Sequence, residues 1–470
     1  MRIALSLPMT LEEIAAAIGC ACAEEKKSTL ITHLTTDSRM VEGGDLFLAL
    51  RGERSDGNAY LPNAFASGAA AAICERVSEG GTCLCVPDAL SALGALAKHY
   101  AAKIPHKTVA VTGSIGKTTT KEFLRCVLAK KFRVHATLGN HNNEIGLPYT
   151  VLSMPKDTEI LILEMGMTGL GEIEYLSKIA LPDVGIVTTI GTSHLERLGT
   201  RENICRAKME ITAGMADGSL LLLQGDEPLL QAQMSHPLAP KSCSYTRGDY
   251  TLEKLSTNES ETFFDASLRT VRLTDCLIPM AGKHAAMAAL FALATAEYFG
   301  MTEEEMKKGL LDYRTDALRQ NKSEHTLMRD GESLHVTLIR DCYNAAPESM
   351  RAALDVLTMT ARKAGGRAVA FLGDMKELGE TSDELHFSVG AYAAKSGISL
   401  LVTYGESAEK IADGALANGF LAENVITLKD TDASQAAKAL LLRLKENDTV
   451  LFKASRAMQV ERVADGLTNQ

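Results

Sequence analysis

The sequence predicts an α/β protein of three domains, and its length, composition and pattern of apolar runs all point to this class. The chain has 470 residues, which corresponds to about three domains of ordinary size. It is 46% hydrophobic and 23% charged, a globular composition. Continuous apolar runs alternate with segments that are apolar at helical spacing, as in parallel sheets covered by helices. We expect domains over residues 1–104, 105–315 and 316–470.

The first domain is expected to be a small α/β unit. Thr10 and Glu13 form a capping-box pattern, which predicts a helix over residues 11–18. Ile104 and Pro105 form a short boundary before the next domain. Between them, the pattern predicts a strand over 45–50 and helices over 64–72 and 89–102.

The second domain begins with the most informative motif of the chain. The apolar run 108–111 leads into the loop Thr112–Thr120, and apolar residues at helical spacing follow. A strand, a glycine turn and a helix start in this order form a phosphate cradle, to which Lys117 adds a charge and Thr118 a hydroxyl for Mg²⁺. We therefore expect a central P-loop domain with a phosphate site on a parallel sheet. The loop residues expected to hold the phosphate groups are Gly113, Ser114, Ile115, Gly116, Lys117, Thr118 and Thr119, and the family resemblance described below implies that these phosphates belong to ATP.

Polar side chains follow two other expected strands of this domain. Glu164 ends the apolar run 159–164, and His194 comes after the run 184–189. Ligand sites in open α/β sheets lie beyond the carboxyl ends of the strands. Both side chains are therefore placed to hold Mg²⁺, together with Thr118 and oxygens of ATP.

An amide-rich loop, 139–146, follows the expected strand 133–137. Asn and Gly favour turns, but three Asn in four residues exceed what a turn needs, so we expect Asn140 and Asn143 to contact the nucleotide. Further on, Lys208 falls on an expected helix, where a solvated face is the default expectation. The domain is expected to end with short hairpins over 240–278 and a helix over 284–299.

The third domain is expected to hold a doubly wound, largely parallel sheet, because apolar runs again alternate with helical segments. Asp341 follows the first of these runs and is placed to reach a ribose hydroxyl or a metal-bound water, with a helix cap as the alternative. Arg319 precedes it and offers a forked donor to phosphate. The expected strands cover residues 334–340, 368–372, 400–404, 425–428 and 449–452.

Charge, apolar runs and cysteines restrict the class of protein further. The formal net charge of −10 argues against nucleic acid as a partner, since that needs a basic surface. The longest apolar candidate, 285–296, has about twelve residues and falls short of the ~20 that a spanning helix needs, so we expect no membrane insertion. The ten cysteines form no CxxC pair, which favours buried thiols in a reducing cytoplasm.

The chain carries a series of motifs that resembles, in the same order, the motifs of the Mur ligase family, and the series extends along nearly the whole chain. Val111 stands where a standard phosphate loop has its first glycine, and this departure is itself typical of the family. The resemblance implies a first domain that binds a UDP-linked substrate, a second that binds ATP and a Rossmann-like third. The motifs are Thr36–Arg39, Gly44–Phe47, Gly52–Gly57, Gly113–Lys121, Gly139–Gly146, Glu164–Gly166, the His194 segment, Ala207–Lys208, Asp341–Pro347, Leu372–Gly379 and Lys453–Arg456.

The resemblance also implies roles for individual residues. Lys117, His194 and Lys208 would be catalytic, and Thr118, Glu164, His194 and Lys208 would surround two Mg²⁺ ions. Lys208 resembles the lysine that this family carbamylates with CO₂, which would turn a cation into a carboxylate-like metal ligand. The other implied contacts are Arg319, Asp341 and Asn344 with ATP, Asp37, Ser38 and Arg39 with the UDP end of the substrate, and Lys453 and Arg456 with the substrate.

The implied activity is that of a cytoplasmic bacterial ligase, acting as a monomer, that joins D-alanyl-D-alanine to UDP-N-acetylmuramoyl-tripeptide. An acyl phosphate would form on the way, and ADP and phosphate would be released. The segment Tyr343–Pro347 favours this reaction over a sister ligase that adds another amino acid, and a nucleotide-binding scaffold without turnover is a further alternative. The sequence departs from the family's usual motifs at Thr189, Ala285, Ala346 and Ala454. These departures concern the expected contacts to adenine and to the dipeptide.

Overall fold

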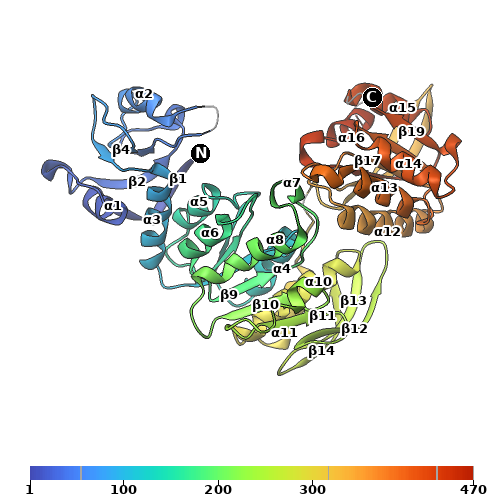
Figure 1. Cartoon of the computed structure of the whole chain (residues 1–470), viewed down its shortest axis with the longest axis horizontal. Coiled ribbons are helices and arrows are strands. Elements are labelled where there is room, and N and C mark those ends of the chain that lie inside the picture. Colours follow the sequence, from blue (N-terminus) through green and yellow to red (C-terminus); the bar gives the residue numbers. More distant parts are fainter. Residues whose placement is uncertain (53–54, 316, 430–431, 469–470) are drawn as a thin grey trace.

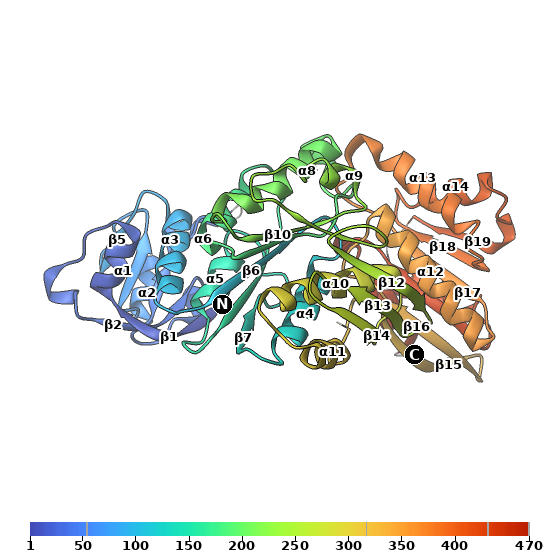
Figure 2. The same cartoon turned by 90° about the horizontal axis from the view of Figure 1, so that it is seen from below.

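The structure is a computed structural model that describes residues 1–52, 55–315, 317–429 and 432–468. Three sheets follow one another along the chain, and Figures 1 and 2 show three lobes in a row with the central domain in the middle. The predicted three-domain α/β class is confirmed. Glu53 and Arg54 of the motif at 52–57, Asp316 at the expected start of the third domain and the last two residues lie outside the described residues.

The first sheet has the order β1-β2-β3-β4-β5, in which β1 and β2 pair antiparallel and the other neighbours pair in parallel. Thr10 caps α1 (Leu11–Ile18) in the predicted capping box, and α3 (Ala89–Ala102) begins and ends as predicted. The strands are β1 (Arg2–Thr10), β2 (Leu30–Thr35), β3 (Leu46–Leu48), β4 (Ala71–Cys74) and β5 (Cys83–Cys85).

The predicted helix over 64–72 is wrong in its second half. Helix α2 covers only Leu61–Ala66, and residues from Ala71 onward form the buried strand β4. Between them Gly68 has a φ of 96°, a left-handed conformation that ends helices. The alanine-rich composition of this segment suits either structure, and burial in the sheet decides between them.

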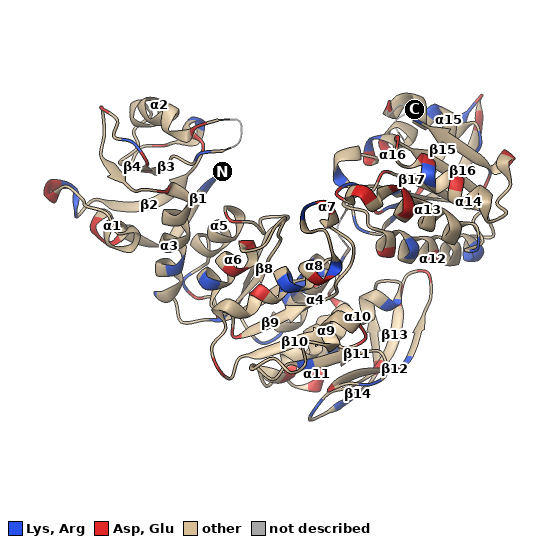
Figure 3. Ribbon diagram, in the orientation of Figure 1, with Lys and Arg blue, Asp and Glu red and all other residues tan. Residues whose placement is uncertain are grey.

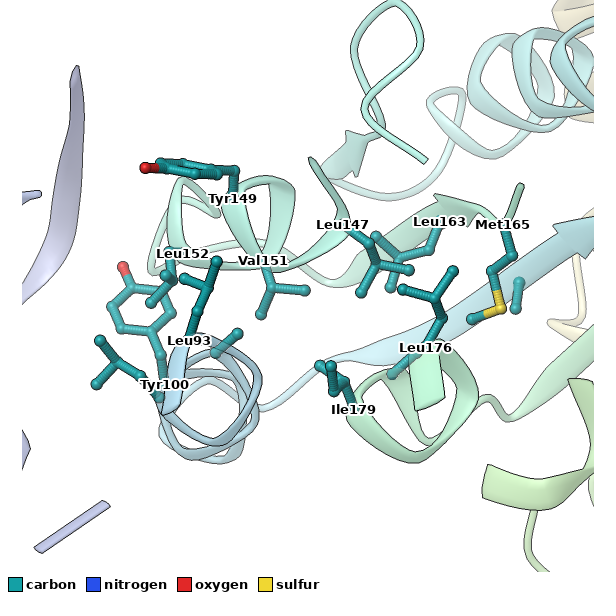
Figure 4. Close-up of a cluster of buried hydrophobic side chains, with 14 of the residues drawn as sticks. Leu93, Tyr100, Leu147, Tyr149, Val151, Leu152, Leu163, Met165, Leu176 and Ile179 are labelled. Atoms are coloured by element: carbon teal, nitrogen blue, oxygen red, sulfur yellow. The ribbon is translucent and has the colours of Figure 1, made fainter. Parts of the chain in front are cut away.

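Helix α3 packs directly on the central domain, against α5 (Gly146–Leu152) and α6 (Glu172–Ala180). Figure 4 shows the apolar cluster to which these helices contribute. Gly94 permits the close approach, since a Cβ there would lie 2.4 Å from Oη of Tyr175. The first two domains therefore share one hydrophobic core.

The second sheet has the order β14-β13-β12-β11-β10-β9-β6-β8-β7. The strands from β7 to β12 pair in parallel, whereas β13 pairs antiparallel with β12 and β14. The hairpins predicted over 240–278 thus extend the central sheet, which is mixed and not wholly parallel. The strands are β6 (Lys107–Thr112), β7 (Val134–Ala136), β8 (Ile160–Glu164), β9 (Val184–Val187), β10 (Leu220–Gln224), β11 (Lys241–Ser244), β12 (Tyr250–Thr257), β13 (Thr262–Ser267) and β14 (Arg272–Ile278).

Helix α4 (Lys117–Leu128) packs against α10 (Lys283–Tyr298) and α11 (Glu303–Leu311). Every residue of α10 from Ala285 to Ala296 is buried, which explains why this helix is apolar all round. Within the described ranges no helix is long and apolar enough to cross a bilayer. Shorter helices of this domain are α7 (Leu195–Leu198), α8 (Arg201–Met209) and α9 (Pro228–Gln231).

The third sheet has the order β15-β16-β20-β17-β18-β19 and is parallel except for the β15–β16 hairpin. Strands β16 to β20 lie where the sequence predicts strands. The edge strand β15 was not predicted, because most of its side chains are exposed or half-buried and no apolar run marks it. The strands are β15 (Asn321–Arg329), β16 (Glu332–Arg340), β17 (Ala368–Gly373), β18 (Leu400–Tyr404), β19 (Val425–Leu428) and β20 (Asp448–Lys453).

In the described part of the third domain, five α-helices accompany this sheet, and α12 is the longest of them. Figure 1 shows α12 on the side of the third domain that faces the central domain. Figure 3 shows acidic and basic residues interspersed along the ribbon of all three domains. The helices are α12 (Pro347–Ala364), α13 (Ser382–Ala393), α14 (Glu409–Ala417), α15 (Ala433–Leu441) and α16 (Glu461–Thr468).

Candidate active site

The predicted phosphate loop connects β6 to α4. Gly113 and Gly116 have φ values of 143° and 87°, which L side chains rarely adopt. A Cβ on Gly113 would also lie 1.9 Å from Oγ1 of Thr188, and that hydroxyl donates to the carbonyl oxygen of Ile115 at 2.6 Å. The loop is therefore held against the end of β9, with no room for a side chain at Gly113.

The side chain of Lys117 folds back over this loop. Its Nζ donates to the carbonyl oxygen of Gly113 at 2.7 Å. Burial lowers the pKa of Lys117; Glu164 opposes this shift, and Arg319 of the third domain adds to it. A basic side chain thus lies at the loop, near a second cation from another domain.

Glu164 lies beside the loop because its strand is the immediate neighbour of β6, with Val111 and Glu164 in register. Its side chain is buried, and both carboxylate oxygens accept hydrogen bonds. Thr118 Oγ1 donates to one oxygen at 2.8 Å, and Asn142 Nδ2 donates to the other at 2.9 Å. The hydroxyl and the carboxylate form a set of hard oxygen ligands, the kind that Mg²⁺ prefers.

Asn142 is a site residue that the sequence reasoning missed, although it lies in the predicted amide loop. The two amides predicted from that loop, Asn140 and Asn143, are exposed. Asn143 Oδ1 accepts from the backbone N–H of Gly146 at 2.9 Å, as in a turn. No local signal separates Asn142 from its neighbours, since only its contact with Glu164 distinguishes it.

Lys208 lies on α8 but is only 1% exposed, so the expected solvated face is wrong. Among the hydrogen bonds and ion pairs of the described residues, none involves its ammonium group. Burial holds the pKa of Lys208 well below its usual range, and the charge of Lys117 lowers it further, while Cys205 opposes. Both effects shift the balance toward the neutral amine.

His194 lies at the contact between the central and third domains, where Figure 1 shows α7. Its Nδ1 lies 2.6 Å from Oε2 of Glu377, and the N–H of Glu196 donates to the carbonyl oxygen of Glu377 at 3.3 Å. The described ranges hold no group of three or more His, Cys, Asp or Glu side chains arranged for a metal ion. In this arrangement His194 contacts the third domain and does not join Glu164 in a ready-made ligand set.

Arg319 borders a cavity of about 220 Å³ between the central and third domains. Its guanidinium carbon lies 3.9 Å from the ring centroid of Tyr343. The same cavity is lined by Thr118 and Thr119 at the start of α4, so Arg319 is placed close to the phosphate loop. The remaining lining residues are Lys121, Glu122, Gly139, Tyr313 and Arg314.

Asp341, Asn344 and Lys453 form one cluster at the carboxyl ends of the neighbouring strands β16 and β20. Lys453 is buried; its Nζ lies 2.6 Å from Oδ2 of Asp341 and donates to the carbonyl oxygen of Asn344 at 3.1 Å. Arg456 is exposed and pairs with Glu461. Lys453, which was expected to contact the substrate, therefore contacts Asp341 and Asn344, which were expected to contact ATP.

The residues expected at the UDP end lie on the first domain, directly after β2. Arg39 is exposed, and its guanidinium donates to both carboxylate oxygens of Asp37, at 2.9 and 2.7 Å. These hydrogen bonds lower the pKa of Asp37 to about 2. Ser38 lies between the two partners, so the segment presents an ordered ion pair on a different sheet from the phosphate loop.

Known proteins resemble this chain along its whole length. The family models described as Mur ligase family, catalytic domain, as Mur ligase middle domain and as Mur ligase, glutamate ligase domain match residues 30–101, 111–296 and 328–456. The UDP-N-acetylmuramoyl-tripeptide--D-alanyl-D-alanine ligase of Bacillus subtilis is 38% identical, and the match covers 97% of this chain and 98% of that protein. The protein of the same name from Synechocystis is 34% identical, with 93% and 92% covered.

Solved structures agree in fold. MurF from Acinetobacter baumannii superposes with a TM-score of 0.88 at 29% identity, covering all of both chains. The MurF ligase from Thermotoga maritima, solved in complex with ADP, gives a TM-score of 0.81 at 31% identity, with 93% of this chain and 97% of that chain covered. With three matching family domains and near full-length relatives above 30% identity, the chain belongs to the Mur ligase family.

Proposed function

We propose that this chain is an ATP-dependent ligase that joins D-alanyl-D-alanine to UDP-N-acetylmuramoyl-tripeptide, with release of ADP and phosphate. One observation carries the proposal: Lys117 and Thr118 lie on a phosphate loop beside the buried carboxylate of Glu164, in a chain whose relatives bear this enzyme's name. A relative solved with ADP supports ATP as the phosphate donor.

The phosphate loop would hold the β- and γ-phosphates through its backbone N–H groups and the amino end of α4. Lys117 donates to the carbonyl oxygen of Gly113, so its ammonium has to turn from that oxygen to the γ-phosphate. Arg319 would add a second positive charge from the third domain, and Asp341 would bind the ribose. Together these groups would stabilise the charge that spreads over the transferred phosphoryl group.

Thr118 and Glu164 fit Mg²⁺, because their oxygens lie 2.8 Å apart and are both hard ligands. When bound, Mg²⁺ neutralises phosphate charge and polarises the phosphoryl group. Asn142 holds the second carboxylate oxygen and so fixes the orientation of Glu164. We propose a second Mg²⁺ at His194 and a carbamylated Lys208, which requires that His194 leaves Glu377.

The reaction then needs two steps. The tripeptide carboxylate attacks the γ-phosphorus of ATP, the bond from that phosphorus to the β,γ-bridging oxygen breaks, and ADP leaves. The dipeptide amine, after losing one proton, attacks the acyl carbon of the acyl phosphate. The tetrahedral intermediate collapses, phosphate leaves with the bonding electron pair, and the nitrogen loses a second proton. Water has to be excluded, because it would hydrolyse the acyl phosphate.

Lys208 is proposed as the site of a carbamate. Its amine is buried without an acidic partner and its pKa is lowered, so the neutral form that attacks CO₂ is favoured. Attack on CO₂ forms an N–C bond with loss of one proton, and the product carries a negative charge beside Lys117. We expect a carbamate carbon signal with ¹³C-labelled bicarbonate in wild type and none in Lys208→Ala. We also expect short carboxylic acids to restore activity to that variant; no rescue of a folded, ATP-binding variant would count against the carbamate.

The remaining expected contacts stay proposals of the same kind. Asp37, Ser38 and Arg39 would meet the UDP end of the substrate on the first domain, and Asn140, Asn143 and Asn344 would meet ATP. Lys453 and Arg456 would contact the substrate from the third domain. We also propose that the enzyme works as a monomer in the bacterial cytoplasm, a reducing compartment that suits its ten free cysteines.

Phosphate release tests the proposed function directly. We expect release from ATP and Mg²⁺ only when the tripeptide precursor and D-alanyl-D-alanine are both present, and assays with lysine or diaminopimelate as the third residue define the precursor. Lys117→Ala should abolish release, whereas Lys98→Ala, at an exposed position on α3, should leave it unchanged. Release that needs only another amino acid would identify a sister ligase, and no release with bound nucleotide would identify a scaffold.

A further inference from the structure

Three side-chain oxygens around Gly191 are buried and have no hydrogen-bond partner among the described residues. They are Oγ of Ser114, Oγ1 of Thr192 and Oε2 of Glu348. The first belongs to the phosphate loop, the second to the segment after β9, and the third to the first turn of α12 in the third domain. Thr192 follows Gly191 in the chain, and Ser114 and Glu348 both approach Gly191. Buried polar atoms are almost always paired, so these unpaired oxygens indicate a missing partner.

Gly191 brings these segments together. A Cβ on Gly191 would lie 3.2 Å from Cβ of Ser114 and 3.4 Å from Oε2 of Glu348. The absence of a side chain at Gly191 therefore allows the phosphate loop and the carboxylate that the third domain contributes to approach the same backbone position. Glu348 takes part in none of the ion pairs found among the described residues, unlike Glu377 on the same domain, which meets His194.

The chemistry of the three oxygens selects the partner. Two hydroxyls alone would suit a phosphate, but a carboxylate oxygen repels one and accepts hydrogen bonds only from donors. The start of α12 favours an acidic side chain through the helix dipole, yet this leaves the buried Oε2 without a donor. A primary ammonium has three N–H groups, and three acceptor oxygens are present to receive them.

We propose that Glu348, Ser114 and Thr192 bind the ammonium group of the incoming D-alanyl-D-alanine. This inference rests on the proposed function and deepens it by naming the residues that receive the second substrate. The amine has to attack an acyl phosphate formed at the phosphate loop, and Ser114 is part of that loop. Because Glu348 belongs to the third domain, the dipeptide ammonium site is complete only when that domain is docked on the central one.

The test compares Glu348→Gln with Glu384→Gln. Glu384 lies in the first turn of α13 in the same domain and is exposed. Like Glu348 it stands at the start of a helix, but it is not part of the proposed site, so it serves as the control. We expect Glu348→Gln to raise the KM for D-alanyl-D-alanine roughly 10- to 100-fold, the size of a lost hydrogen bond to a charged group. The KM for ATP should stay within about twofold in both variants. Glu384→Gln should behave as wild type throughout.

A second assay separates substrate binding from a structural role. Hydroxylamine is a neutral amine at pH 7 and traps the acyl phosphate without needing a carboxylate. We expect Glu348→Gln to form the hydroxamate at the wild-type rate with the tripeptide precursor and ATP. Equal losses in both assays would mean that Glu348 supports the phosphate loop, and an unchanged KM for the dipeptide would also overturn the proposal.

Gly191→Ala offers an independent check, because its methyl group would lie 3.2 Å from Cβ of Ser114 and 3.4 Å from Oε2 of Glu348 and would displace both groups of the proposed site. It should raise the KM for the dipeptide like Glu348→Gln, and this variant decides the question if Glu348→Gln does not fold. Should wild type form hydroxamate but show no turnover with the dipeptide, the proposed function fails at its second substrate. Turnover in wild type with no dipeptide effect in either variant refutes the ammonium site alone.

Discussion

Nδ1 of His194 lies 2.6 Å from Oε2 of Glu377, and this contact joins the central domain to the third domain. Both residues have a positive φ, 68° for His194 and 66° for Glu377. Such conformations are costly for residues other than glycine and persist where the surroundings hold them. The contact therefore links a proposed metal ligand to the docking of the third domain.

Glu377→Ala is expected to weaken this docking. The two side chains are 21% and 56% exposed, so their contact contributes at most about 1 kcal/mol. Small-angle scattering should show a larger radius of gyration for the variant than for wild type without ligands. An ATP analogue with the tripeptide precursor should compact both proteins as the third domain closes. Equal radii for wild type, Glu377→Ala and the exposed control Glu380→Ala would show that the contact does not hold the domains together.

Glu164→Gln is expected to raise the Mg²⁺ concentration needed for half-maximal turnover by at least about tenfold, since a carboxylate is replaced by a neutral amide. The amide keeps an acceptor for the hydroxyl of Thr118, so the loop should stay folded. A titration of turnover against Mg²⁺ after chelation of the wild-type protein measures this. Glu172→Gln, whose side chain accepts from Thr168 instead, is the control. Identical Mg²⁺ curves for wild type and Glu164→Gln would exclude Glu164 as a ligand.

Gly113→Ala is expected to abolish nucleotide binding and to lower the free energy of unfolding by more than about 1–2 kcal/mol. The added Cβ meets Oγ1 of Thr188 at 1.9 Å, and the φ of 143° is unfavourable in addition. Gly218→Ala is the matched control, because Gly218 has a φ of 85° but open space around it. Urea unfolding and nucleotide titration calorimetry check both variants. Similar losses in the two would mean that backbone strain alone matters, without the contact to Thr188.

The stability of the third domain is expected to fall as the pH drops below about 6.5. His386 is buried, its Nε2 accepts from the N–H of Met375 at 2.9 Å, and burial lowers its pKa below the ordinary 6.5. The unfolded chain therefore binds more protons than the folded one in this range, so acid favours unfolding. Thermal unfolding between pH 7 and 5 should be less pH-dependent in His386→Gln. His335→Gln, at an exposed position of the same domain, should retain the wild-type slope.

Much of the phosphate site could be predicted from the sequence because its signals are local. The run 108–111, the glycines of the loop and the helical spacing after Lys117 all lie within about twenty residues. Glu164 could be predicted because strands of a parallel sheet end at one edge, and its register with Val111 agrees.

Other features depend on contacts that no local pattern contains. The spacing around Lys208 is that of any amphipathic helix, and only the packing of α8 shows that its ammonium is buried. Asn142 differs from Asn143 by one position, and their roles separate only where the loop meets Glu164. The contact between His194 and Glu377 joins two domains, and neither sequence segment contains a pattern that predicts it.

Helix α3 packs through apolar side chains on α5 and α6. Because of this packing, we expect fewer units of cooperative unfolding than there are sheets. A single core joins the first two sheets, so neither can lose its packing without exposing the other. The third sheet has cores of its own and meets the central domain through side chains such as Lys363 with Glu259. We therefore expect the three architectural domains to unfold as two cooperative units, with the phosphate loop in the larger one.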